Sequence, residues 1–207
     1  MRYVLFVAWL VSAVPAFSQA NEITIQFGKV VGEGRRFSVD ALPGQFIPEE
    51  AGLAGGIVYN RRIVGGRAAS LHFHLPFFAF ENTSSAANLP DNPLGDTSSL
   101  TGFTTPGLQL RLLDSFPLQP YAFAGVGYAY VARIAPDEGL RSLTVDHEGT
   151  WGVSAGGGLS VMFNSNFGLR GEIRSLTTGA ASRIVPGLTL DDPGTRWAAT
   201  GGLVFRF

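Results

Sequence analysis

The histidines of this sequence are the residues whose type and spacing best suit chemistry. His72 and His74 are one residue apart and would point the same way on a strand, where two imidazoles could ligate a metal. A zinc site needs more than two ligands, and no third histidine or acidic pair lies near them in the sequence. A polar interior position is therefore the simpler interpretation.

His147 stands between Asp146 and Glu148, close to Trp151, and could act as the base of a lipid-modifying enzyme. No nucleophile at a recognisable spacing accompanies it, so a solvated position at a loop end is the simpler interpretation. The glycines at 156–158 lack the lysine and helix of a phosphate-binding loop. The absence of cysteine excludes disulfides and thiolate sites. We predict no catalytic residue, no metal site and no cofactor.

Charged residues recur at alternate positions of otherwise apolar or small-residue stretches. The set comprises Arg111, Arg170, Glu172, Arg174 and Arg206. Because successive strand side chains point to opposite faces, these residues share a face with small residues. Unpaired charges in an apolar interior are costly, so we expect a polar network in a narrow lumen. Arginine is in excess, so either acids such as Glu22, Asp114 or Glu148 reach inward, or the lumen holds water and anions.

The composition indicates an envelope protein more than a soluble one. Of 207 residues, 45% are hydrophobic, only 15% are charged and 27 are glycine, and the formal net charge is −1. A typical soluble surface needs more charge, and a disordered chain would be less apolar. The basic residues form no polybasic run, so nothing indicates nucleic-acid binding.

The first residues have the three parts of a secretory signal peptide. A short cationic start at 1–3 precedes an apolar run at 4–14 and the small-residue site Ser18-Gln19-Ala20. The apolar run is shorter than the roughly 20 residues of a membrane-spanning helix. We place cleavage before Asn21, which gives a signal peptide at 1–20 and an outer-membrane β-barrel domain at 21–207.

The remaining chain alternates apolar residues with small or polar ones in separate segments. The expected strands are 22–30, 49–60, 67–80, 101–113, 119–133, 149–163, 167–176 and 197–207. Long polar stretches at 31–48, 81–100, 134–148 and 177–195 alternate with short connections at Arg61-Arg62, 114–118 and 164–166. This alternation is typical of a barrel with both termini in the periplasm. We predict an all-β fold, an eight-stranded antiparallel up-and-down transmembrane β-barrel.

The last segment is long enough to cross a membrane. At about 3.3 Å per residue it extends about 36 Å, and a tilt of about 40° leaves a height of about 27 Å. It resembles the closing strand of bacterial outer-membrane barrels, in which alternating hydrophobic residues lead to a C-terminal Phe that the assembly machinery recognises. Leu203, Phe205 and Phe207 occupy those alternating positions. The mature chain as a whole resembles the small OmpA/OmpX-like barrel family.

Several aromatic residues are candidates for the girdles that flank an apolar band. They are Trp151, Trp197 and Phe207, together with Tyr121 and Tyr128. Ordinary core packing is the alternative for each of them. The facing of segment 119–133 stays open, because aromatic residues occur at both parities of that segment.

These observations favour an integral protein of the outer membrane of a Gram-negative-type bacterium. We expect a structural or surface-interaction role through long extracellular loops, with an unknown loop ligand. The other expected partners are outer-membrane lipid, lipopolysaccharide and the barrel-assembly machinery. One alternative is a small, weakly conducting porin-like channel, motivated by the arginine-rich face. Others are a lipid-modifying envelope enzyme, motivated by His147, and a soluble exported barrel with a lipocalin-like cavity.

Overall fold

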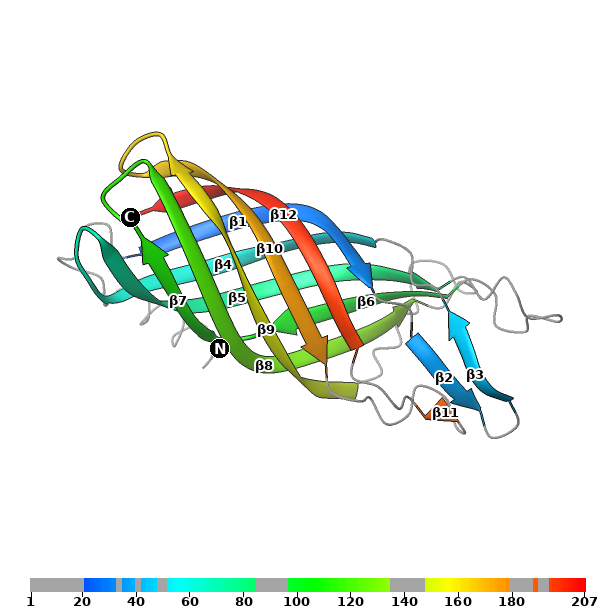
Figure 1. The fold of residues 1–207 in the computed structure, drawn as a ribbon. Helices are drawn as coiled ribbons and strands as arrows, with labels where there is room; N and C mark the ends of the chain where they lie inside the picture. Colours follow the sequence, from blue (N-terminus) through cyan, green and yellow to red (C-terminus); the bar gives the residue numbers. More distant parts are fainter. Residues whose placement is uncertain are drawn as a thin grey trace, which may run out of the picture.

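The chain forms a closed antiparallel β-barrel of eight staves (Figure 1), which confirms the predicted fold class. The computed structural model describes residues 21–32, 35–39, 42–47, 52–84, 97–134, 148–178, 188–189 and 194–207. The barrel strands are β1 (Asn21–Gly32), β4 (Gly52–Gly65), β5 (Ala69–Ser84), β6 (Thr97–Thr104), β7 (Gly107–Leu112), β8 (Leu118–Ile134), β9 (Glu148–Met162), β10 (Phe167–Thr178) and β12 (Gly194–Arg206). The barrel closes because β1 pairs with both β4 and β12.

Short turns and long connections alternate around the barrel, as expected. The short turns at 66–68, 113–117 and 163–166 lie at one end, and the strand ends that the long connections join lie at the other. Asn21 and Phe207 meet at the short-turn end, where each backbone N–H donates to the carbonyl oxygen of the other residue, at 3.1 and 2.9 Å. The proposed signal peptide at 1–20 lies outside the described residues. No helix among the described residues is long and apolar enough to cross a membrane.

Strands occupy parts of three expected connections, at Arg61-Arg62, 31–48 and 177–195. Arg61 and Arg62 do not form a turn, because both continue the pairing of β4 with Phe73 and His72 of β5. A bulge after Arg62 lets β4 run on to Gly65, whose φ of 153° suits glycine at the turn. The expected loop at 31–48 contains β2 (Arg35–Val39) and β3 (Leu42–Ile47). With β11 (Leu188–Thr189) these form a separate sheet at the long-connection end.

The expected strand at 101–113 is divided into β6 and β7, which together form one stave. Both pieces pair with β5 on one side and β8 on the other. Pro106 lies in the break and has no N–H to donate, and the facing stretch of β5 contains Pro76. A proline on each side removes ladder hydrogen bonds, which explains why the stave is interrupted here.

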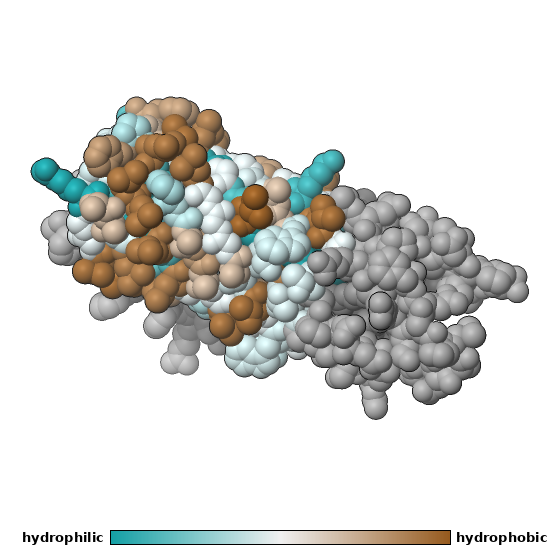
Figure 2. Space-filling model, viewed as in Figure 1, coloured by the Kyte–Doolittle hydropathy of each residue, from teal (hydrophilic) through white to brown (hydrophobic). Residues whose placement is uncertain are grey.

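Large apolar side chains cover the outer face of the barrel, as Figure 2 shows for one side. Their exposed fractions range from 39% to 70% for Ile25, Phe27, Leu53, Ile57, Phe77, Leu108, Leu110, Val153, Leu169, Ile173 and Leu203. The alternate residues of the same strands face inward and are buried. The polarity of the barrel is therefore the reverse of that of a soluble protein, with apolar groups outside and charged groups inside.

The structure decides the facing of β8, which the sequence left open. Tyr121 and Phe123 point inward and are each 5% exposed, so Tyr121 is not a girdle residue as proposed. Both rings pack against glycines of β9: Tyr121 pairs with Gly158 and Phe123 with Gly156. Glycine on the neighbouring strand makes the room that an inward aromatic ring needs in a narrow barrel.

The interior has two layers. Towards the long-connection end it contains an apolar cluster formed by Val30, Ala54, Phe78, Phe80, Phe103, Ala129, Leu176 and Ala198. Towards the short-turn end it contains a network of charged and amide side chains, described below. We call these layers the apolar cluster and the polar network.

The contact between Gly158 and Tyr121 predicts the effect of enlarging this glycine. A Cβ atom at Gly158 would lie 2.1 Å from the carbonyl oxygen of Gly171 and 2.5 Å from the Tyr121 hydroxyl. Gly158→Val should therefore displace both the β10 backbone and the ring, and lower the free energy of unfolding by about 1–3 kcal/mol. Gly171→Val is the matched control, because a Cβ there meets no atom within 4 Å. Urea titration in detergent measures both variants, and equal stabilities would contradict the proposed packing.

Candidate functional site

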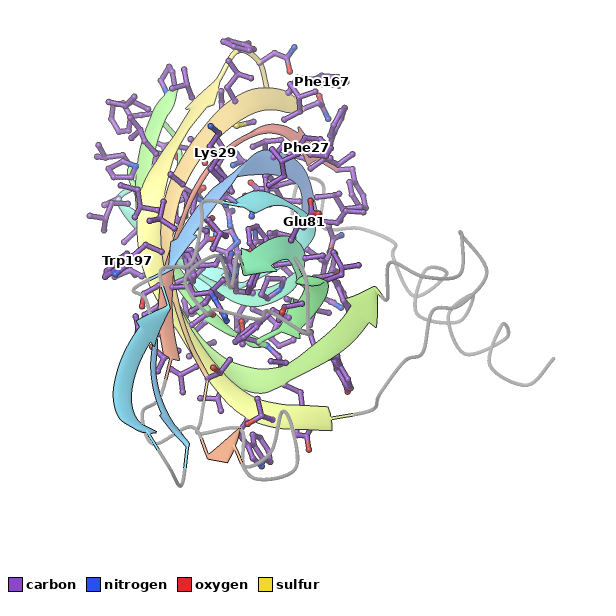
Figure 3. The ribbon with its side chains drawn as sticks, turned by 90° about the vertical axis from the view of Figure 1, so that its right-hand side faces the viewer. Phe27, Lys29, Glu81, Phe167 and Trp197 are labelled. Carbon is purple, nitrogen blue, oxygen red and sulfur yellow. The ribbon has the colours of Figure 1, made fainter. Side chains whose placement is uncertain are left out.

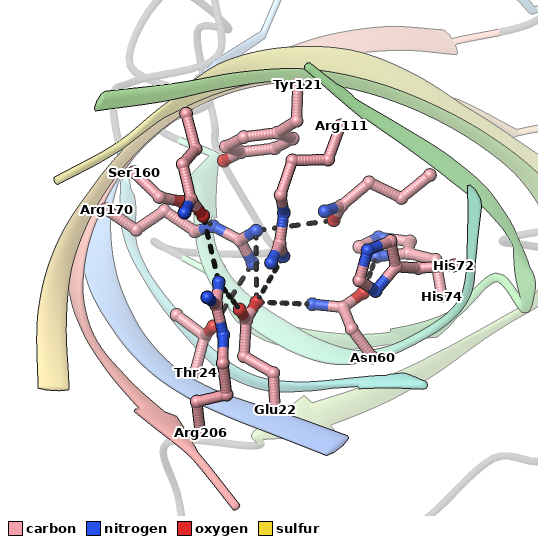
Figure 4. A network of polar contacts seen from close by, with 12 residues as sticks. Glu22, Thr24, Asn60, His72, His74, Arg111, Tyr121, Ser160, Arg170 and Arg206 are labelled. Atoms are coloured by element: carbon pink, nitrogen blue, oxygen red, sulfur yellow. Dashed lines mark hydrogen bonds and ion pairs between the residues drawn. The ribbon is translucent and has the colours of Figure 1, made fainter. Parts of the chain in front are cut away.

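The carboxylate of Glu22 is the centre of the polar network (Figure 4). Its Oε1 accepts from Arg111 Nη2 at 2.7 Å and lies 3.3 Å from Arg170 Nη2, and its Oε2 accepts from Arg206 Nη2 at 3.1 Å. Asn60 Nδ2 also donates to Oε1, at 3.1 Å. The five side chains come from β1, β4, β7, β10 and β12, so one carboxylate links staves from all around the barrel.

A second carboxylate, Asp114, joins the short-turn end to this centre. It pairs with Arg62, and its Oδ1 lies 3.6 Å from Arg111 Nη1. Gln119 Nε2 donates to the carbonyl oxygen of Asp114 at 2.9 Å, and Gln119 Oε1 accepts from Arg206 Nη2 at 2.9 Å. The turn after β7 is thereby fixed to the interior by charged hydrogen bonds.

Glu172 is the third buried carboxylate and binds Arg174. Arg174 donates to Glu172 Oε1 from Nε at 2.9 Å and from Nη2 at 2.7 Å. The Tyr121 hydroxyl donates to Glu172 Oε2 at 2.9 Å, and the Arg170 guanidinium lies 4.2 Å from the centre of the Tyr121 ring. Through Arg170 this pair is continuous with the Glu22 centre.

The histidine pair lies within the network, as the simpler interpretation expected. His74 Nδ1 is 2.7 Å from Asn60 Oδ1, and His72 Nε2 is 2.8 Å from the Ser70 hydroxyl. The ring of His74 stacks on Phe123 with centroids 4.6 Å apart. No group of three His, Asp or Glu side chains within the described ranges could hold a metal ion. His147 lies outside those ranges.

The structure places all five charged residues of the expected network inside the barrel. Their exposed fractions are 1% for Arg111, 2% for Arg170, 3% for Glu172, 1% for Arg174 and 8% for Arg206. The acids that offset the arginines are Glu22 and Asp114, the first of the two alternatives left open. Glu22, which the first alternative named, shares the inward parity of Thr24 and Gln26 on β1. The inward position of Tyr121 could not be predicted, because aromatic residues occur at both parities of its strand.

The expected girdle residues lie on the outer face at two levels. Trp151 is 67% exposed, Trp197 49% and Phe207 51%. Trp197 pairs with Val31 near the long-connection end and points away from the barrel (Figure 3), whereas Phe207 is at the short-turn end. Leu203 is also exposed. Phe205 is half-buried and makes an edge contact with the Phe167 ring, with ring centroids 5.1 Å apart. Leu203 and Phe205 therefore lie on the outward parity of β12, and Phe207 follows the strand on the same parity.

The arrangement of the interior suits a structural role more than a chemical one. Every arginine of the Glu22 centre is bound to a carboxylate, and Thr24, Ser160 and Gln119 accept further hydrogen bonds from these arginines. Within the described residues no nucleophile is hydrogen-bonded to a base with a third orienting group, as acid–base catalysis would require. The network joins staves and fills the lumen.

The central position of Glu22 predicts a large cost for removing its charge. Glu22→Gln leaves three buried guanidinium groups with a neutral partner, so we expect the free energy of unfolding to fall by about 3–5 kcal/mol. Glu81→Gln on the exposed outer face of β5 is the control and should change it by less than about 0.5 kcal/mol. A Glu22→Gln variant as stable as the parent protein in urea titration would refute the assignment of Glu22 as the centre.

Comparison with known proteins finds similarity of structure only. No protein-family model and no curated protein sequence matches the chain. Neisserial surface protein A, NspA, superposes with a TM-score of 0.61 at 12% identity, covering 93% of this chain and 100% of that one. The outer membrane protein OprG from Pseudomonas aeruginosa superposes with a TM-score of 0.48 at 13% identity, covering 90% and 97%. The chain has the fold of the small eight-stranded outer-membrane β-barrels.

Proposed function

We propose that this chain is an integral outer-membrane protein of a Gram-negative-type bacterium. We further propose that it acts as a structural or surface-interaction module through its long connections. The observation that carries the proposal is the apolar outer face, which surrounds an interior where charged groups are paired. In water this arrangement would expose a continuous apolar surface far larger than a soluble monomer presents.

The height of the apolar face supports a bilayer as its partner. Along β4 the outward charge at one end is Arg61, and at the other end Leu53 pairs with Lys29 of β1, an exposed outward residue. The eight steps between Arg61 and Leu53 correspond to roughly 26 Å of strand, or about 20 Å of height at a tilt near 40°. This is close to the apolar band of about 25 Å of an outer-membrane barrel.

The proposed partners follow from the same surface. Trp151, Trp197 and Phe207 would meet lipid and lipopolysaccharide headgroups, because aromatic residues form girdles at both interfaces of outer-membrane barrels. Leu203, Phe205 and Phe207 would present the closing strand to the barrel-assembly machinery. In the sequence, acidic residues outnumber basic ones in the long connections 33–51, 85–96, 135–147 and 179–193. A surface ligand of these connections would therefore encounter net negative charge.

Envelope fractionation and gel mobility test the membrane proposal together. We expect the protein in the outer-membrane fraction, with a mature N-terminus at Asn21. We also expect a compact form that migrates faster unboiled than boiled in detergent, because the closed barrel resists detergent until it is heated. A periplasmic protein without a heat-dependent shift would contradict the proposal and direct attention to a lipocalin-like cavity.

A weakly conducting channel is the second candidate, and the excess of buried arginine favours it. Our proposal predicts no discrete openings in planar bilayers, because Arg111 and Arg174 are 1% exposed and both interior layers are densely occupied. Reproducible openings that disappear in an Arg170→Ala/Arg174→Ala variant would establish the channel instead.

We propose no catalytic activity. The residue that motivated a lipid-modifying enzyme, His147, adjoins Asp146 and Glu148 without a nucleophile at a recognisable spacing. Lipid A profiles of cells with and without the protein should therefore be identical.

A further inference from the structure

The hairpin that joins β4 to β5 is cationic and exposed at its tip, residues 61–68. The tip carries Arg61, Arg62 and Arg67, and all three are exposed. Two apolar side chains lie between these arginines, Ile63 at 57% and Val64 at 62% exposed. We call this segment the hairpin tip. It combines exposed positive charge with exposed apolar surface.

Backbone hydrogen bonds hold the hairpin tip in place. Gly66 N–H donates to the carbonyl oxygen of Ala69 at 2.9 Å. Leu113 N–H, in the turn after β7, donates to the carbonyl oxygen of Ala68 at 2.7 Å. The tip is therefore a preformed surface, and a partner could bind it without the cost of ordering its backbone.

The outward side of the hairpin continues the apolar outer face of the barrel. Val64 pairs with Leu71 of β5, and Leu71 pairs with Leu110 of β7, which is 49% exposed. Arg61 pairs with the outward Phe73. The arginine therefore lies beside an apolar surface rather than within a polar one.

The exposed side-chain charge at the short-turn end is cationic throughout the part of the chain that the structure describes. The two carboxylates at this end, Glu22 and Asp114, are 2% and 5% exposed and are bound to arginines inside the barrel. Asp114 pairs with Arg62. Arg61 and Arg67 form no ion pair or side-chain hydrogen bond with a described residue. An anion from outside the chain would therefore meet two available guanidinium groups.

The chemistry of the hairpin tip favours a lipid headgroup as that anion. A guanidinium group donates paired hydrogen bonds to phosphate oxygens, and every glycerophospholipid carries a phosphate. The apolar side chains beside the arginines would contact the acyl chains of the same lipid, which a free phosphate ion lacks. A lipid with net negative charge is preferred over a zwitterionic one, because arginine repels the ammonium group of a zwitterionic headgroup.

We propose that the hairpin tip binds the headgroup of an anionic phospholipid through Arg61 and Arg67, in the leaflet around the short-turn end. Ile63 and Val64 contact the acyl chains of that lipid. This site rests on the proposed membrane function, because it requires that the outer face of the barrel lies in a bilayer.

A fluorophore at the hairpin tip tests which lipid lies beside it. The chain has no cysteine, and a Cβ atom at Gly66 would meet no atom within 4 Å, so Gly66→Cys can carry a bimane label without crowding. The labelled barrel is reconstituted in vesicles of phosphatidylcholine and phosphatidylglycerol in equal amounts. Bimane quenching is then compared with bromine on the acyl chains of one lipid or of the other. We expect brominated phosphatidylglycerol to occupy the position about fivefold more often than brominated phosphatidylcholine.

Charge variants of the labelled barrel show whether the arginines cause this preference. Arg61→Gln/Arg67→Gln should abolish it, and Arg61→Lys/Arg67→Lys should keep most of it, because the charge is retained. Lys29→Gln is the matched control, since it also removes an exposed outward cation but lies at the other end of the apolar face. It should leave the preference unchanged.

Two results would overturn the proposed lipid site. They are equal quenching by the two lipids in the labelled parent barrel, and an unchanged preference in the double glutamine variant. Heat-dependent gel mobility of the same samples reports insertion separately. A barrel that does not insert into vesicles would contradict the membrane function and this site with it, whereas an inserted barrel without a lipid preference would contradict only the site.

Discussion

A single buried carboxylate, Glu22, determines much of how this barrel is assembled. Removing a charge from water is costly, and the cost is recovered only when partners with good geometry surround it. Arg111, Arg170 and Arg206 meet at Glu22 from three other staves, and Asn60 adds a fourth. A strand shifted by one residue would turn its arginine outward and leave the carboxylate with fewer partners. The network therefore specifies strand register as well as filling space.

Glycine residues provide the space that this crowded interior requires. An eight-stranded barrel is only wide enough for its own side chains, so large inward residues require small ones beside them. Gly156 and Gly158 of β9 receive Phe123 and Tyr121 of β8, and Gly56 of β4 receives Phe78 of β5. The high glycine content thus reflects packing between neighbouring staves. It also lets the arginines stack on aromatic rings, as Arg174 does on Phe123 at 4.5 Å.

Because side chains fill the interior, we expect the function of this protein to depend on its surfaces. Under the proposed function, the outer face contacts lipid and the long connections contact partners outside the cell. The fold shared with NspA does not identify those partners, since one barrel architecture supports many activities. The interior of this chain is divided into a polar network and an apolar cluster.

Local covalent geometry explains which features were predictable from the order of residues. Alternation of side chains is a property of every strand, so the number of staves, the outward apolar face and the inward arginines could be predicted without coordinates. The break at Pro106, the continuation of β4 through Arg62 and the inward facing of Tyr121 could not. Each depends on which residues of another stave lie opposite: the stretch of β5 with Pro76 faces the break, His72 pairs with Arg62, and Gly158 pairs with Tyr121. Pairing partners are set only when the barrel closes, because closure fixes the register of all staves together.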